Sequence, residues 1–142
     1  MSLSISEKDR EFITQVEACE FPIPEFNHKA HIRLAYAYLV ENNTKASIQL
    51  MKNTLIGLLE FAGIEPSQKY HETITKAWVL AVHHFMSKTS NSESADEFIN
   101  KNPELLDSKI MLTHYSAEVL FSQEARESFI EPNLSPIPRH DS

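Results

Sequence analysis

Hydrophobic residues recur at every third or fourth position along most of this chain, a spacing that places them on one face of an α-helix. The pattern predicts four main helices, running from about Ser6 to Cys19, Asn27 to Glu41, Thr44 to Gly63 and Gln68 to Lys88. A side-chain oxygen at the N-terminal end can accept a bond from the first free backbone N–H groups. We therefore expect the caps of these helices to be Ser6, Asn27, Thr44 and Ser67.

The second half of the chain predicts shorter elements. Ser94-Ala-Asp-Glu97 has the spacing of a capping box, Asn102-Pro103 has that of a cap followed by a first helical residue, and Ser108 to His114 is also helical in pattern. Ser116 and Ser122 are expected to cap two further turns. The fold predicted is an all-α, single-domain irregular bundle of four main helices with short C-terminal ones.

Three segments between or after the helices predict non-helical backbone. Phe21-Pro22-Ile23-Pro24 is expected to be an extended connector, because proline disfavours helix at the residue before it. The polar stretch from Ser87 to Ser94 is expected to be a mobile loop. Residues 131–142 contain three of the seven prolines, so this tail is expected to be extended or disordered.

Histidines lie on or beside the apolar faces of two predicted helices. His28 shares a stripe with Ile32 and Leu39, and His31 lies one step to the side, on a helix that should be largely surrounded by protein. His71 and Thr75 flank the apolar stripe of the fourth helix. A buried imidazole needs a hydrogen bond, a carboxylate or a metal ion as a partner, so these residues predict a polar site inside a helical core.

Composition narrows the classes of function. The chain has 142 residues, a net charge of −7 and only two glycines, which excludes phosphate-binding loops that need several glycines close together. It has no basic stripe for nucleic acid and no apolar run long enough to cross a membrane. Because residues 1–10 lack the apolar stretch of a signal peptide, we expect none. Cys19 is its only cysteine, so we expect a cytoplasmic protein without internal disulfides. With nucleic acid and membranes set aside, the candidate partners are a small-molecule ligand and further copies of this chain in a homo-oligomer.

His28, His31 and His71 form the candidate metal site. His28 and His31, three positions apart on one helix, can reach one ion, and His71 can add a third imidazole if the two helices pack side by side. Three imidazoles with an open position are typical of a catalytic divalent metal, here zinc or iron. The alternative is that these histidines only form hydrogen bonds in the core, His28 to a backbone carbonyl.

His71 and Thr75, one helical turn apart, are the candidate catalytic residues. The imidazole would act as a ligand or general base, and the hydroxyl would bind the substrate or orient the ring. A third hypothesis combines these two residues in acid–base catalysis without a metal. The structural alternative is that the Thr75 hydroxyl bonds back to the carbonyl of His71, as threonine often does within helices.

Five further residues are candidates for substrate binding. Arg33 could clamp an anion, with a structural salt bridge as its alternative, and His114-Tyr115 could close the site at a helix end. The remaining two are Tyr70 and Trp78, which flank His71 and Thr75 in the sequence. The alternative for Trp78 is a place in the core.

These residues belong to motifs that resemble a set of uncharacterised small bacterial all-helical proteins. The motifs are Phe26-x-His28-x-x-His31-Ile-Arg33-x-Ala35-Tyr36, Tyr70-His71-x-Thr73-x-Thr75-x-Ala77-Trp78, His114-Tyr115-Ser116, Ala125-Arg126 and Glu131-Pro132-Asn133-Leu134. The resemblance covers the chain from Phe26 to Pro138. It implies that the motifs act as one unit and implies no reaction. Asn133 stands where such proteins favour aspartate, which weakens a ligand role there.

Two functional hypotheses follow. The first is a small cytosolic protein whose histidine-lined internal site binds a divalent metal and a small molecule, with a hydrolytic or an oxygen-dependent reaction both compatible. The second is a non-enzymatic binding or interaction domain whose histidines are hydrogen-bonded core residues.

Overall fold

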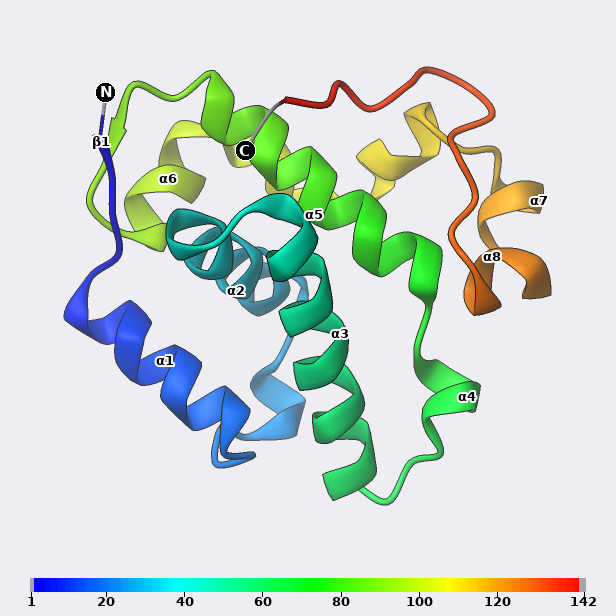
Figure 1. Cartoon of the computed structure of the whole chain (residues 1–142), viewed down its shortest axis with the longest axis horizontal. Helices are drawn as coiled ribbons and strands as arrows, with labels where there is room; N and C mark the ends of the chain where they lie inside the picture. The colour runs from blue at the N-terminus through cyan, green and yellow to red at the C-terminus, as the bar shows by residue number, and fades with distance from the viewer. Residues whose placement is uncertain (1, 141–142) are drawn as a thin grey trace.

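A computed structural model describes residues 2–140, and over this range the chain is all-α apart from one short pair of strands (Figure 1). The four predicted main helices are present as α1 (Glu7–Glu17), α2 (His28–Glu41), α3 (Thr44–Phe61) and α5 (Glu72–Ser87). Shorter α-helices are α4 (Pro66–Lys69), α6 (Ala95–Lys101), α7 (Ala117–Leu120) and α8 (Gln123–Glu127). Segments of 3-10 helix are η1 (Ile23–Glu25), η2 (Pro103–Leu106) and η3 (Ser108–Thr113). The strands β1 (Ser2–Leu3) and β2 (Asn91–Ser92) pair in parallel.

Local capping sets the starts of most helices where the sequence predicted them. Each cap accepts a hydrogen bond from a backbone N–H in the first helical turn, and Ser6 forms a full capping box with Asp9. The other confirmed caps are Asn27, Ser94, Ser116 and Ser122. Gly63 follows the end of α3 with a φ of 77°, a left-handed conformation that costs glycine little.

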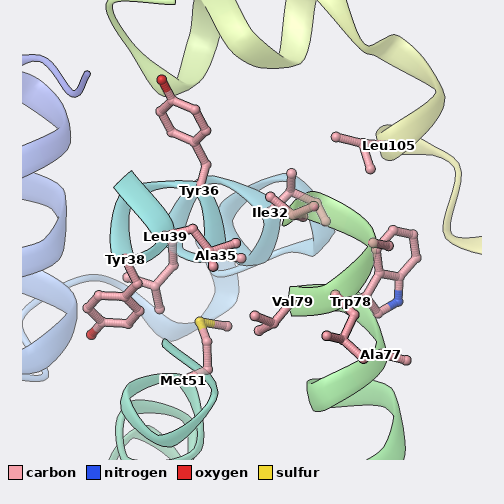
Figure 2. Packing of buried hydrophobic residues seen from close by; sticks show 14 of the residues in the cluster. Ile32, Ala35, Tyr36, Tyr38, Leu39, Met51, Ala77, Trp78, Val79 and Leu105 are labelled. Atoms are coloured by element: carbon pink, nitrogen blue, oxygen red, sulfur yellow. The ribbon is translucent and has the colours of Figure 1, made fainter. Parts of the chain in front are cut away.

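Helix α2 lies at the centre of the molecule, in agreement with the prediction that this helix is largely surrounded by protein. It packs against α1, α3, α5 and α6, and most of its residues are buried. Figure 2 shows Met51 of α3 and Val79 of α5 on one side of α2, while Tyr36 points away from them. The Tyr36 ring stacks on Phe98 of α6 with centroids 4.6 Å apart. Burial of this continuous apolar cluster is the main contribution to stability.

The prediction of one continuous fourth helix from Gln68 to Lys88 is wrong at its N-terminal end. The chain is extended at Tyr70 and His71, which separates α4 from α5, and His71 rather than Ser67 caps the long helix. The imidazole Nδ1 of His71 accepts the N–H of Ile74 at 3.1 Å. An imidazole can replace the usual hydroxyl or carboxamide cap because its unprotonated nitrogen is also a hydrogen-bond acceptor.

Other local predictions also need correction. The cap of α3 is Asn43, with Thr44 as the first helical residue, and the connector expected to be extended contains the 3-10 turn η1. The segment from Ser87 to Ser94, expected to be a mobile loop, contains β2 and two buried residues. Thr89 bonds the carbonyl of Phe85, and Ser92 bonds that of Ser94. Hydrogen bonds therefore allow this polar sequence to pack.

The tail is extended and docked over its described part, residues 131–140, and residues 141–142 lie outside the described range. Leu134 and Ser135 donate backbone bonds to the carbonyls of His114 and Thr113. Ile137 is buried, and His140 bonds His84 of α5. In Figure 1 the tail, coloured orange to red, runs back across α5.

Candidate functional site

Two adjoining pockets open between the N-terminal ends of α2 and α5. The first has a volume of about 340 Å³ and the second about 440 Å³, and both are lined by Phe26, His31 and Ile74. The first pocket extends along the C-terminal half of α3 to α4, and the second extends to η3 and α7. The packing of α2 against α5 thus brings the predicted histidine motifs to neighbouring walls.

The first pocket is mainly aliphatic. Its polar lining consists of His31, Lys69, Tyr70, His71 and Thr75. Its apolar lining is Ile23, Phe26, Leu55, Leu58, Leu59, Ala62, Ile64 and Ile74. A concave apolar surface with few polar groups is the usual form of a small-molecule site.

His31 lies where the two pockets meet. Its ring contacts Phe26 edge-on, with centroids 6.5 Å apart, and forms no hydrogen bond with any residue in the described range. Burial, followed by the neighbouring His28, lowers the pKa of His31 to about 4. The imidazole is therefore neutral near pH 7 and presents one N–H and one lone pair to the cavity.

The neutral state of His31 gives a testable pH dependence of stability. Unfolding returns its pKa from about 4 to the ordinary 6.5, so the unfolded chain binds the extra proton between these values and the free energy of unfolding rises with pH there. We expect wild type to lose about 1–2 kcal/mol more than a His31→Leu variant between pH 7 and pH 4.5. Urea unfolding at several pH values measures this, and parallel curves for the two proteins would contradict it.

His28 forms a hydrogen bond to a backbone carbonyl, as the structural alternative for this residue predicted. Its Nε2 lies 2.8 Å from the carbonyl oxygen of Leu105, and because a carbonyl only accepts, Nε2 must donate. The ring also contacts Trp78 edge-on, with centroids 4.7 Å apart. His28 and Trp78 both line the second pocket, so they shape its wall while stabilising the packing of η2 on α2.

Both ring nitrogens of His71 are engaged. Nε2 donates to the carbonyl of Leu120 at 2.7 Å, and Nδ1 accepts from Ile74, as described above. Burial, together with the positive charge of Arg126, lowers the pKa of His71. Thr75 donates to the carbonyl of His71 at 2.8 Å, which is the structural alternative for that residue. His71 therefore has no free ring nitrogen, and the Thr75 hydroxyl keeps only its acceptor lone pairs.

The three predicted metal ligands do not fit a three-histidine centre as they lie. A metal ion needs one free lone pair from each imidazole, and His71 has already used its lone pair to cap α5. Among residues 2–140 no group of three or more histidine, cysteine, aspartate or glutamate side chains is placed to hold a metal ion. The zinc or iron site stays a prediction, one that requires His71 to leave its cap.

The remaining predicted substrate-binding residues separate into two groups. Tyr70 lines the first pocket, and its hydroxyl donates to Glu72; burial and the adjacent Glu72 raise its pKa, so the phenol stays protonated. Arg33, His114 and Tyr115 line neither pocket.

Arg33 forms the predicted salt bridge, and its partner is Asp9 of α1. The two side chains are joined by a bond of 3.1 Å from Nε to Oδ1, and the guanidinium also lies over the Phe12 ring. Asp9 is almost fully buried and accepts two more bonds, from the backbone N–H groups of Ser6 and Ala95. Arg33 therefore links α2 to α1, and Asp9 in turn links α1 to the start of α6.

His114 and Tyr115 hold the tail instead of closing a pocket. His114 Nδ1 lies 2.7 Å from the carbonyl of Ser135, and the Tyr115 hydroxyl donates to the carbonyl of Ile130. The side chain of Asn133 bonds both the backbone and the hydroxyl of Ser116. The His114-Tyr115-Ser116 motif is therefore hydrogen-bonded to the Glu131-Pro132-Asn133-Leu134 motif, where the chain folds back on itself.

The sequence did not identify the aliphatic wall of the first pocket or Lys69 at its edge. Leu55, Leu58 and Ile64 have the spacing of core residues, and nothing in a single sequence separates a residue that lines a cavity from one that is tightly packed. Lys69 belongs to no motif, so nothing in the sequence marked it as a pocket residue. Only the placement of α4 beside α3 and α5 brings it to the pocket.

Comparisons with known proteins do not add a functional assignment. No protein-family profile matches the chain, and no significant match was found among curated proteins or solved structures. Within residues 2–140, none of the helices combines the length and apolar character needed to cross a membrane. The geometry of the two pockets is therefore the basis from which a function is inferred.

Proposed function

We propose that this protein is a non-enzymatic binder of a small, mostly apolar organic molecule, held in the first pocket next to His31. The observation that carries the proposal is the position of His31, which meets both apolar pockets with a neutral imidazole that has no protein hydrogen-bond partner within residues 2–140. His31 is only partly buried, so its ring nitrogens are reached from the pockets, where a ligand atom or water can bond them.

The size and lining of the pocket support a ligand of modest size. About 340 Å³ is near the lower end of the range of roughly 300–1,000 Å³ common for small-molecule sites. Its aliphatic wall favours an apolar body, because transfer of such a group from water is the main source of affinity. The bonds of His71 and Thr75 favour binding over acid–base catalysis, since both side chains already serve the start of α5.

The test uses N-phenyl-1-naphthylamine, a neutral dye whose fluorescence rises in apolar surroundings. We expect a saturable rise with wild-type protein and an affinity at least tenfold lower for an Ala62→Trp variant. Ala62 is an exposed residue after α3 that lines the mouth of the first pocket, so an indole there blocks entry without disturbing the core.

The matched control is Gln49→Trp, which adds the same indole to an exposed position of α3 outside both pockets. This variant should bind the dye as wild type does. A folded wild-type protein that gives no saturable signal would contradict the proposed function. Equal dye binding by Ala62→Trp and wild type would place the dye outside the first pocket and count against it as well.

A further inference from the structure

The two pockets lack acidic residues although the chain as a whole is acidic. The sequence has 20 aspartate and glutamate residues against 13 lysine and arginine residues, yet no carboxylate lines either pocket. The charged residues that do line them are Lys69 in the first pocket and Lys109 in the second. Local charge at this site is therefore opposite in sign to the net charge of −7.

Lys69 is the one charged residue among those described that line the first pocket. It lies exposed at the end of α4 and forms no ion pair or ring contact with any residue in the range 2–140. Glu72, three positions further along, is engaged by Lys52 at 3.4 Å and by the Tyr70 hydroxyl. Lys109 of the second pocket likewise forms no ion pair within residues 2–140, and only its backbone N–H bonds the carboxylate of Asp107.

We infer that the ligand is an amphiphilic monocarboxylic acid whose apolar body lies along Leu55, Leu58 and Ile74 and whose carboxylate meets the ammonium group of Lys69 at the mouth of the first pocket. This inference depends on the proposed function and specifies its ligand. A carboxylate at the mouth keeps part of its hydration, whereas one deep in the aliphatic part would pay the full desolvation cost. No arginine lines the first pocket, and a single lysine matches one negative charge.

The experiment measures displacement of N-phenyl-1-naphthylamine by decanoate and by decanol, which have carbon chains of equal length, near neutral pH. The carboxylate of decanoate is hydrated far more strongly than the hydroxyl of decanol, so a purely apolar pocket would favour decanol. We expect decanoate to displace the dye from wild type at a concentration equal to or lower than decanol does. We also expect added salt to weaken displacement by decanoate only.

The variant that isolates the charge is Lys69→Gln, with Lys45→Gln as the matched control. Lys45 is an exposed lysine at the start of α3 that lines neither pocket. An ion pair at a partly exposed site is worth up to about fivefold in affinity, so Lys69→Gln should raise the required decanoate concentration about threefold to fivefold. It should leave decanol unchanged, and Lys45→Gln should alter neither.

The outcomes separate this inference from the function on which it depends. Preference for decanol in wild type, or an equal effect of Lys69→Gln on both compounds, would overturn the carboxylate while the apolar binding site stands. Displacement by neither compound, with the dye bound, would likewise overturn it. Absence of dye binding would overturn the proposed function and this inference together.

Discussion

An Asp9→Ala variant is expected to lose about 3–4 kcal/mol of unfolding free energy, the largest effect of any single change considered for this protein. The substitution removes three hydrogen bonds at once, from Arg33 and from the backbone N–H groups of Ser6 and Ala95. It also leaves Arg33, whose side chain is only 24% exposed, without its counter-charge. Chemical denaturation measured by circular dichroism gives the difference.

The control for Asp9 is Asp96→Ala. Asp96 is 68% exposed and reaches only Lys29, at 3.9 Å, so its loss should change stability by less than about 0.5 kcal/mol.

Burial opposes ionisation of Asp9, but the bonds from Ala95, Ser6 and Arg33 outweigh it and hold its pKa below the ordinary 3.8. The contribution of Asp9 is therefore present above about pH 4 and is lost as the pH falls through its folded pKa. A gap between wild type and Asp9→Ala that stayed constant into strong acid would contradict this account.

A His71→Ala variant is expected to lose about 2–3 kcal/mol, the second largest effect. About 1 kcal/mol comes from the missing cap of α5, because the Ile74 N–H loses its acceptor. The rest comes from the carbonyl of Leu120, a buried residue whose hydrogen-bond donor is removed. Thermal and urea unfolding of the tag-free protein measure the loss.

His71→Asn separates the two bonds of this histidine. Asparagine is a good N-cap and can accept the Ile74 N–H, but it is too short to reach the carbonyl of Leu120. It should therefore recover about 1 kcal/mol of the loss. Elemental analysis of the same proteins tests the alternative, a metal site formed by His28, His31 and His71. Unchanged stability of His71→Ala, together with loss of near-stoichiometric zinc or iron, would favour the metal site over the capping role.

Helix positions were predictable from the sequence because their determinants are local. Ser6, Asn27 and Ser94 each bond a backbone group three residues ahead, so a short window contains both partners. The break before α5 was missed because it depends on His71 reaching Leu120, which is 49 positions away. Periodicity alone continued the helix through Tyr70.

The structure brings four of the candidate residues to the first pocket, while Arg33, His114 and Tyr115 lie elsewhere; the four are His31, Tyr70, His71 and Thr75. The spacing placed His28 and His31 near one apolar face, but both look alike at that level. Their roles diverge only because the carbonyl of Leu105 lies next to His28, whereas a cavity lies next to His31. The packing of distant segments decides which histidine is satisfied, and a single sequence does not contain that information in readable form.

The bond between the Asp9 carboxylate and the Ala95 backbone spans 86 positions of the chain, and that of His28 with Leu105 spans 77. Closing such long loops costs chain entropy before the contacts that reward it have formed. Folding rates fall as the sequence separation of native contacts rises. We therefore expect this domain to fold more slowly than an up-and-down helical bundle of equal length.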